Sequence, residues 1–357
     1  MEKSFPHYGK TLTRENLLPL LRATDADLSA LYARADAVRR ENCGDAVPIR
    51  AILEFSNVCA NDCLYCGIRA SNPDPIRYQM AAADIRAAAR QIAGEEIAGT
   101  IVLQAGETPG ASDDAIAALI RDIKTDCPAL AITLSVGNRP RHVYARWRDA
   151  GMDRYLLRFE TSDAALFARL HPAGTLAERL RCLRDLQALG VQTGGGFMIG
   201  LPGETVETLA DNILLCREFD FDMIGIGPYI PHPGTPLSHA PNVYADDPDM
   251  FFRAIAVLRL ATPLAHIPAT TAFDALFSDG RDRALQCGAN VFMPNATPRP
   301  YRRAYQLYPG KPCIDEEALD CSRCVQHRLH TLGRPIAPGP SHSLKMKSDS
   351  HVLNPDS

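Results

Sequence analysis

The sequence predicts an α/β fold, a (β/α)8 barrel of the TIM type with N-terminal helices and a C-terminal extension. Eight short apolar runs rich in β-branched residues follow residue 48, and segments with Ala, Leu, Arg and Asp at helical spacing separate them. Alternating strands and helices are typical of a parallel sheet covered by helices. Eight such units in one domain favour closure into a barrel. The alternative is an open barrel of six units whose last units form a separate lobe.

The elements follow in chain order. Residues 1–48 are expected to be helical, because leucines recur at helical spacing and Thr13 and Thr24 are suitable N-cap residues. The barrel is expected over residues 49–312. Its expected strands are residues 49–56, 99–105, 130–136, 153–159, 191–200, 221–227, 266–271 and 288–294.

The C-terminal part divides into two segments. Residues 313–333 carry a group of cysteines. Residues 334–357 are rich in Pro, Ser and His and have few periodic apolar residues, so we expect this tail to be disordered.

Composition excludes several classes of partner. The formal charge of −4 over 357 residues gives no broad basic field, so neither nucleic acid nor an acidic membrane surface is an expected partner. There is no apolar run of about 18 residues, and the N-terminus lacks the apolar core of a secretory signal. We therefore expect a cytoplasmic protein whose thiols stay reduced.

Cysteine spacing carries the strongest chemical signal. The stretch EFSNVCANDCLYCGIR, residues 54–69, places Cys59, Cys63 and Cys66 directly after the first expected strand, where barrels carry their chemistry. Three thiolates this close repel each other unless a cation holds them. A zinc ion would need a remote fourth ligand, which would make the protein a zinc-stapled scaffold. A 4Fe–4S cluster on three cysteines instead leaves one iron open to bind a cosubstrate.

The CxxxCxΦC pattern, with Tyr65 as the aromatic residue, resembles the radical S-adenosylmethionine (SAM) superfamily. The resemblance implies an enzyme with a 4Fe–4S cluster and SAM as cofactors, and a one-electron reductant as partner. In that chemistry the open iron chelates the methionine part of SAM. One-electron reduction then releases a 5′-deoxyadenosyl radical, and the protein orients the reactants and excludes water.

Other strand ends carry groups suited to SAM. QAGE, residues 104–107, resembles the superfamily's GGE element and retains Gly106 and Glu107, with Ala105 in place of the first glycine. GGGFMIGLPGE, residues 194–204, includes Gly200 and offers glycines that let backbone approach a ligand, although a tight strand-to-helix turn would explain the run equally well.

The stretch RYLLRFET, residues 154–161, puts charges on one face of a strand. Alternation places Arg154, Arg158 and Glu160 on the same side. Because such charges are costly in a dry core, they are expected to line a polar cavity with anionic guests; simple ion pairs are the alternative. Arg179, in the following helix, could clamp a carboxylate or form a surface salt bridge.

Within the superfamily the chain resembles the HydE family of FeFe-hydrogenase maturases over residues 50–324. The likeness rests on runs such as TIVLQAGE, DRYLLRFET, FDMIGIGPYIPHPGTPL, CGANVFMPN and YQLYPGK. Biotin synthase and methylornithine synthase, which act on small organic substrates, are the nearest alternatives. The HydE resemblance implies a cysteine-bound iron carbonyl-cyanide complex as substrate and other hydrogenase maturases as partners.

The same resemblance implies roles for individual residues. Arg158, Thr270 and Thr271 match positions that line the substrate cavity. The positions that match residues near SAM are Tyr65, Gly106, Glu107, Arg154, Glu160, Arg179, Gly200 and Tyr305.

A second cysteine triplet, Cys313, Cys321 and Cys324, has the form C-x7-C-x2-C. HydE-type proteins sometimes hold an auxiliary cluster at this place, so a second 2Fe–2S or 4Fe–4S cluster is expected here. Three thiols near solvent, or an oxidised pair, are the alternatives.

Overall fold

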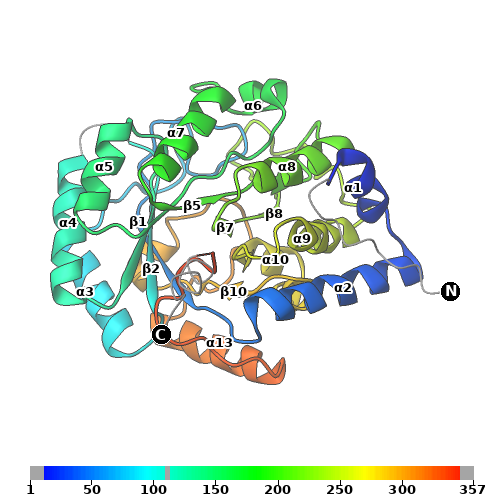
Figure 1. Ribbon diagram of the computed structural model, residues 1–357. Coiled ribbons are helices and arrows are strands. Elements are labelled where there is room, and N and C mark those ends of the chain that lie inside the picture. The colour runs from blue at the N-terminus through cyan, green and yellow to red at the C-terminus, as the bar shows by residue number, and fades with distance from the viewer. Residues whose placement is uncertain (1–11, 109–112, 346–357) are drawn as a thin grey trace.

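Six parallel strands form the main sheet of the computed structural model, which describes residues 12–108 and 113–345 (Figure 1). Their order is β1-β2-β3-β4-β5-β7, so neighbours in the sheet follow one another along the chain. The bounds are β1 Arg50–Ser56, β2 Thr100–Ala105, β3 Ala131–Ser135, β4 Arg154–Leu156, β5 Gln192–Gly195 and β7 Met223–Ile224. Two short parallel pairs complete the strands: β6 Met198–Ile199 with β8 Gly227–Pro228, and β9 Pro268–Ala269 with β10 Val291–Phe292.

Backbone contacts close these strands into a barrel. Met223 of β7 forms a bridge with His266, just before β9, and Phe292 of β10 forms one with Ile49, just before β1. Ile52 of β1 also exchanges hydrogen bonds with the segment after β10, from Ile52 N to Pro294 O at 2.8 Å and from Ala296 N to Ile52 O at 2.7 Å. All eight expected strand positions therefore lie in the wall, and the predicted (β/α)8 barrel is confirmed.

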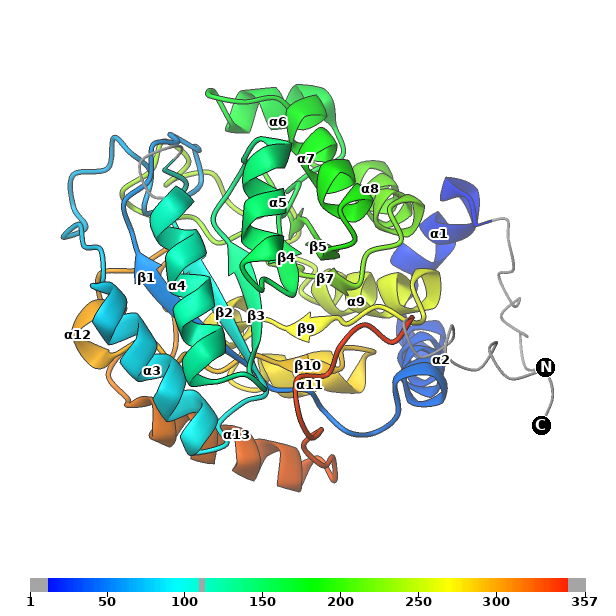
Figure 2. The same ribbon diagram turned by 60° about the vertical axis from the view of Figure 1, so that its left-hand side comes forward.

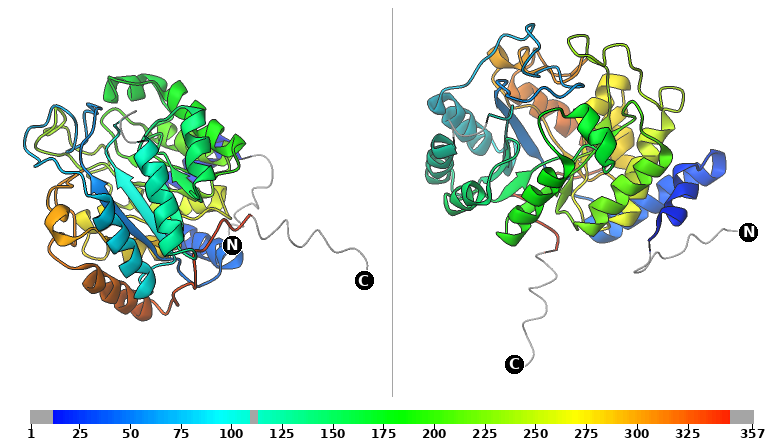
Figure 3. Two further views of the ribbon diagram at one scale, coloured as in Figure 1. Left: turned by 90° about the vertical axis from the view of Figure 1, so that its left-hand side faces the viewer. Right: turned by 90° about the horizontal axis from the view of Figure 1, so that it is seen from above.

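Helices cover the outside of the wall. Helices α3, α4 and α5 stand side by side against the first strands, and α7, α8 and α9 continue the ring (Figures 2 and 3). The bounds of the helices are α1 Arg14–Leu21, α2 Asp25–Cys43, α3 Ala82–Gly94, α4 Asp113–Asp126, α5 Arg141–Asp149, α6 Ala164–Leu170, α7 Leu176–Ala188, α8 Val206–Glu218, α9 Asp249–Ala261, α10 Thr271–Leu276, α11 Gly280–Gln286, α12 Arg299–Arg302 and α13 Ala318–Thr331. No helix in the described ranges is long and apolar enough to cross a membrane.

The N-terminal helices begin where the sequence predicts. Thr13 and Thr24 are the N-cap residues of α1 and α2. Leu17, Leu21 and Leu31 are fully buried, because α1 packs on α8 and α2 packs on α9.

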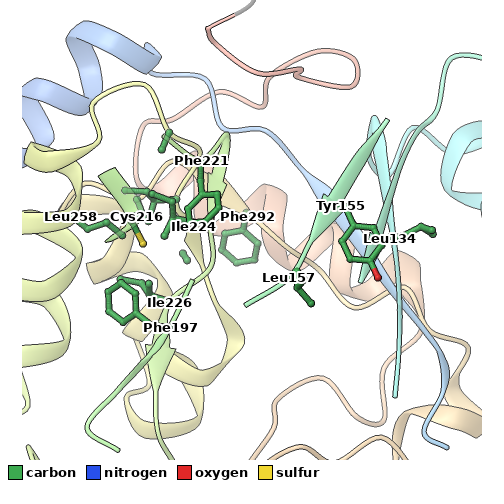
Figure 4. Close-up of a cluster of buried hydrophobic side chains, with 14 of the residues drawn as sticks. Leu134, Tyr155, Leu157, Phe197, Cys216, Phe221, Ile224, Ile226, Leu258 and Phe292 are labelled. Atoms are coloured by element: carbon green, nitrogen blue, oxygen red, sulfur yellow. The ribbon is translucent and has the colours of Figure 1, made fainter. Parts of the chain in front are cut away.

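The apolar core lies between the strands and this ring of helices. Side chains of strands and of α8 and α9 meet there, among them Cys216, Ile224, Leu258 and Phe292 (Figure 4). This layer holds the wall rigid, so the loops after the strands have a fixed base.

The prediction of a disordered tail is wrong for residues 334–345. This segment, which we call the floor segment, crosses the amino-terminal ends of the strands. Val47 exchanges two backbone hydrogen bonds with this segment. Val47 N donates to Pro335 O at 2.8 Å, and Ala337 N donates to Val47 O at 2.9 Å. Residues 346–357, which the same prediction covered, lie outside the described residues.

Buried polar groups of the barrel explain why the floor segment is ordered despite its composition. The carbonyl of Pro340 accepts hydrogen bonds from Thr100 Oγ1 and Arg154 Nη2, both at 2.9 Å. Ser343 Oγ donates to Asp222 Oδ1 at 2.5 Å. These donors and acceptors are fixed in the barrel, so polar partners, rather than apolar residues, order the segment.

Removal of the floor segment should destabilise the barrel. A chain that ends at Gly333 leaves Arg154, Asp222 and Thr100 without these partners, and we expect it to lose about 3 kcal/mol or more of unfolding free energy. Urea unfolding followed by circular dichroism measures the difference. A chain that ends at Lys345 keeps every contact described above and is the control; equal stability of the two truncated chains would contradict the prediction.

Candidate active site

A cavity of about 320 Å³ lies inside the barrel at the carboxyl ends of the strands. All but two of the residues predicted for the first cluster, SAM and substrate line it. They are Cys59, Cys63, Tyr65, Cys66, Gly106, Glu107, Arg158, Glu160, Arg179, Thr270, Thr271 and Tyr305. The volume is in the range of small-molecule sites.

The three cysteines stand on one loop, residues 57–66, which we call the thiol loop. It follows β1 and is held against the end of β2 by Gly106 N, which donates to Ser56 O at 3.0 Å, and by Ala60 N, which donates to Glu107 O at 2.8 Å. A Cβ atom on Gly106 would lie 2.2 Å from the Val58 carbonyl oxygen. Glycine is therefore required here by contact between two backbones.

The thiols need a cation in order to ionise together. Burial, and then the nearby Cys59, raise the pKa of Cys63 to about 12; burial, and then Cys63, raise the pKa of Cys66. In the described ranges no three His, Cys, Asp or Glu side chains converge tightly enough to hold a metal ion. Thiolates on one zinc ion lie about 4 Å apart, given Zn–S bonds of about 2.3 Å. An iron–sulfur cluster binds each thiolate to a different iron, so it would not require the three thiols to converge on one atom.

Tyr65 fixes the loop from its other side. Its hydroxyl lies 2.7 Å from His171 Nε2, and Leu64 N donates to Leu170 O at 3.0 Å. Burial lowers the pKa of His171 to about 3, so its imidazole is neutral and can accept a hydrogen bond from the Tyr65 hydroxyl. His171 is a residue that the sequence analysis missed, since a single histidine after a short helix gives no pattern.

Charged side chains also line the cavity. Arg158 Nη2 lies 2.8 Å from Glu160 Oε2, and Arg179 Nη2 lies 3.6 Å from Glu107 Oε2. Arg158 Nε and Arg179 Nε are nevertheless buried without a hydrogen-bond partner. Such groups are costly unless a polar guest satisfies them, so this wall fits the amino, carboxylate and hydroxyl groups of SAM and of a charged substrate.

The backbone of Glu160 has a strained conformation. Its φ is 64°, a region that non-glycine residues rarely occupy, and bonds to the neighbouring strand hold it there: Glu160 N to Gly196 O at 3.1 Å and Met198 N to Glu160 O at 3.1 Å. Strain of this kind persists where a side chain must be aimed at a site.

A hydroxyl-rich wall completes the cavity. Thr271 Oγ1 lies 2.7 Å from the hydroxyl of Tyr308, and Thr270 Oγ1 donates to Ile226 O at 2.9 Å. Tyr305 accepts a hydrogen bond from Gln104 Nε2 at 3.2 Å. Tyr308 was not predicted, although it lies in the run YQLYPGK beside Tyr305.

The two tyrosines belong to a loop, residues 303–312, that a buried ion pair anchors. Lys311 Nζ donates to Glu54 Oε1 and, at 3.1 Å, to Tyr305 O. Both charged side chains are almost fully buried. The pair ties the loop to β1, the strand that leads into the thiol loop.

Two residues predicted near SAM lie elsewhere. Arg154 begins β4 at the opposite end of the barrel, where it bonds Thr100 and the floor segment; the face assignment was right, but strand length puts it too deep. Gly200 does not line the cavity. Its φ is 87°, and a Cβ there would lie 1.7 Å from Asn242 Oδ1, so this glycine serves the turn that the sequence analysis gave as its alternative.

The second triplet is only partly assembled. Cys321 accepts a hydrogen bond from Arg302 Nη1 at 3.4 Å, and the neighbouring Cys313 and Arg302 lower the pKa of the Cys321 thiol. Cys324, one helical turn further along α13, is exposed. The auxiliary cluster thus stays a prediction.

Comparison with known proteins agrees with this geometry. Residues 53–216 match the radical SAM superfamily. The chain is 46% identical over 326 residues to the FeFe hydrogenase maturase subunit HydE of Thermotoga maritima, covering 91% of this chain and 92% of that one. It is 29% identical to biotin synthase of Desulforudis audaxviator, over 78% of this chain and 82% of that one. Among solved structures, methylornithine synthase superposes with a TM-score of 0.81 at 23% identity, covering 98% of both chains, which supports the fold alone.

The fold, the thiol loop and these matches define an enzyme of the radical SAM superfamily. Within that superfamily the chain belongs to the HydE family.

Substitution of Gly106 by Ala should displace the thiol loop. The new methyl group would overlap the Val58 carbonyl oxygen, and we expect a loss of about 2 kcal/mol in unfolding free energy together with faster alkylation of the loop cysteines. Urea unfolding and timed iodoacetamide labelling measure the two effects. Gly94→Ala, at a helical glycine with nothing within 4 Å of its Cβ position, is the matched control. Identical behaviour of the two variants would show that the loop tolerates the methyl group.

Proposed function

We propose that this protein reductively cleaves SAM and acts on a cysteine-bound iron carbonyl-cyanide complex during assembly of the FeFe-hydrogenase H-cluster. The observation that carries the proposal is the single cavity that joins the three thiols to the arginines Arg158 and Arg179, each of which keeps a buried Nε atom without a hydrogen-bond partner. The identity to HydE supports the maturation role, since it well exceeds the identity to biotin synthase.

The thiol loop would hold the cluster. Cys59, Cys63 and Cys66 would each ligate one iron, and when bound the cluster supplies the electron that splits the sulfonium of SAM into methionine and a 5′-deoxyadenosyl radical. The protein's part is positional: Gly106 and His171 keep the loop in place, and the closed barrel excludes water from the radical.

The charged wall would bind SAM and substrate side by side. Arg179 and Glu107 lie on the same side as Cys63, and are suited to the carboxylate and ammonium groups of methionine. Arg158, Thr270 and Thr271 offer a guanidinium and two hydroxyls for the cyanide and carboxylate groups of the complex. In this arrangement the radical carbon would form a bond to the cysteine sulfur of the substrate while the bond between that sulfur and the cysteine Cβ breaks, so that the unpaired electron passes to the departing group.

The thiol loop can be tested without knowledge of the substrate. Cys63→Ala should abolish formation of 5′-deoxyadenosine from SAM in anaerobically reconstituted protein with dithionite, a loss of at least about 100-fold, because two thiolates cannot retain the cluster. Chromatographic quantitation of 5′-deoxyadenosine measures it, and Cys127→Ala, at an isolated buried thiol, is the control. Continued SAM cleavage by Cys63→Ala would refute the radical mechanism, and one zinc per chain without labile sulfide would support the scaffold instead.

A second variant addresses the substrate. Arg158→Lys keeps a positive charge but loses the planar fork, so hydrogenase activation in a maturation mix that depends on this protein should fall about 10-fold or more. Formation of 5′-deoxyadenosine should fall far less. Arg303→Lys, at an exposed side chain, is the control. A parallel fall of both readouts would place Arg158 at SAM rather than at the substrate. Turnover of dethiobiotin or lysine by the unaltered protein would favour the alternatives, a biotin synthase-like or methylornithine synthase-like enzyme.

A further inference from the structure

The thiol loop continues into a stretch that leads back to β1. We call this stretch, residues 67–77, the return segment. Directly after it, Ser56 pairs with Gln79 in an antiparallel bridge, and Met80 N donates to Phe55 O at 2.8 Å. The chain therefore comes back to the strand from which the thiol loop departs, and the three cysteines lie within one excursion whose two ends meet beside β1.

One guanidinium bonds both ends of the thiol loop. Nη1 of Arg77 donates to the carbonyl oxygens of Asn57 and Ile68, each at 2.8 Å. Nη2 donates to the carbonyl oxygens of Arg69, at 2.6 Å, and Asn72, at 2.9 Å. Asn57 is the first residue of the thiol loop, and Ile68 and Arg69 follow its last cysteine. The guanidinium thus closes the thiol loop into a ring.

The guanidinium suits this task by its shape as well as by its charge. It is planar and presents its N–H groups as a rigid fork, whereas an ammonium is a compact charge with three donors. Hydrogen bonds from a charged donor are also stronger than those between neutral groups. Because carbonyl oxygens that point at one place repel each other, a cation with this spread of donors allows the two ends of the loop to meet.

Other contacts fix the return segment against the rest of the barrel top. Gly67 N donates to Leu307 O at 3.0 Å, and Asn72 Nδ2 donates to Gly67 O at 2.6 Å. A Cβ atom on Gly67 would lie 2.2 Å from Gln306 O and 2.6 Å from the ring of His232. The return segment is therefore a fixed support, and the guanidinium ties the start of the thiol loop to it.

We propose that Arg77 is a positioning residue for the iron–sulfur cluster. By closing the thiol loop into a ring, it holds Cys59, Cys63 and Cys66 at their spacing before the cluster binds, and it slows the loss of the cluster afterwards. The inference rests on the proposed function, because it takes the thiol loop to be the cluster site.

The physical reason is the entropy of the loop. A closed loop has fewer conformations to lose when its three thiols bind one rigid group, so less of the binding free energy is spent on ordering it. Residues that orient metal ligands without touching the metal typically change metal affinity or activity by about 10- to 100-fold when they are replaced.

Thiol labelling of the metal-free, full-length protein tests the ring without the cluster. In Arg77→Ala the loop cysteines should react with iodoacetamide about 10-fold faster or more, because several charge-assisted hydrogen bonds are lost. Mass spectrometry of each cysteine peptide measures the rates. Arg334→Ala is the matched control, since its guanidinium also donates to carbonyl oxygens, Asp45 O at 3.0 Å and Leu285 O at 3.3 Å, but in the floor segment. Equal labelling of the two variants would overturn the proposal.

Iron release from the anaerobically reconstituted protein to a chelator tests the effect on the cluster. Arg77→Ala should release iron about 10-fold faster or more than the unaltered protein and than Arg334→Ala. Added ethylguanidinium supplies the missing fork and should slow the release, whereas ethylammonium carries the same charge without the fork and should not. An equal response to the two compounds would contradict the positioning role.

Because Arg77→Ala could fail to fold, Arg77→Lys is the second variant. It keeps the charge and most of the stem, and it should still label faster and lose iron faster than the unaltered protein. If it matches the unaltered protein in both measurements, the proposal is wrong. If the unaltered protein holds no cluster, the proposed function fails and this inference with it; if it holds one and the variants hold it equally well, only this inference fails.

Discussion

The contact between two backbones at Gly106 is the constraint on which the site depends. The thiol loop has no regular structure of its own, so its position comes from hydrogen bonds to the end of β2 and from the close approach that a missing side chain allows at Gly106. The same element presents Glu107 to Arg179. One short turn therefore sets both where the thiols stand and where the charged wall begins, and a ligand that touches both is held in a defined orientation.

The barrel divides its buried charge between its two ends. At the carboxyl end, Arg158 and Arg179 keep unpartnered Nε atoms beside a cavity that can admit a ligand. At the amino end, Arg154 is bonded to protein partners and to the floor segment, which covers that end. The large cavity lies at the other end, where the thiols are.

The sequence predicted the barrel because strand and helix patterns alternate without interruption. Most of the residues to which the motifs and the family resemblance pointed line one cavity, because parallel strands bring their carboxyl ends together. The prediction from the sequence was wrong where the role of a residue depends on how far it lies from the carboxyl ends of the strands. Arg154 and Arg158 share a face, but they lie four residues apart along a strand direction, which is enough to separate the floor from the cavity. The sequence also could not reveal that residues 334–345 are ordered, since their partners are polar groups of distant strands.

The ion pair of Lys311 and Glu54 connects the loop of residues 303–312 to β1, the strand that leads into the thiol loop. Removal of one partner from a buried pair leaves a charge without compensation, which costs more than the intact pair contributes. This asymmetry keeps the loop of residues 303–312 seated on β1, and with it Tyr305 and Tyr308 at the cavity. Because β1 runs directly into the thiol loop, the wall that would face the substrate and the wall that would hold the cluster are fixed to the same strand. The distance between them is thus set by β1 itself, as the proposed reaction between a short-lived radical and a neighbouring sulfur atom would require.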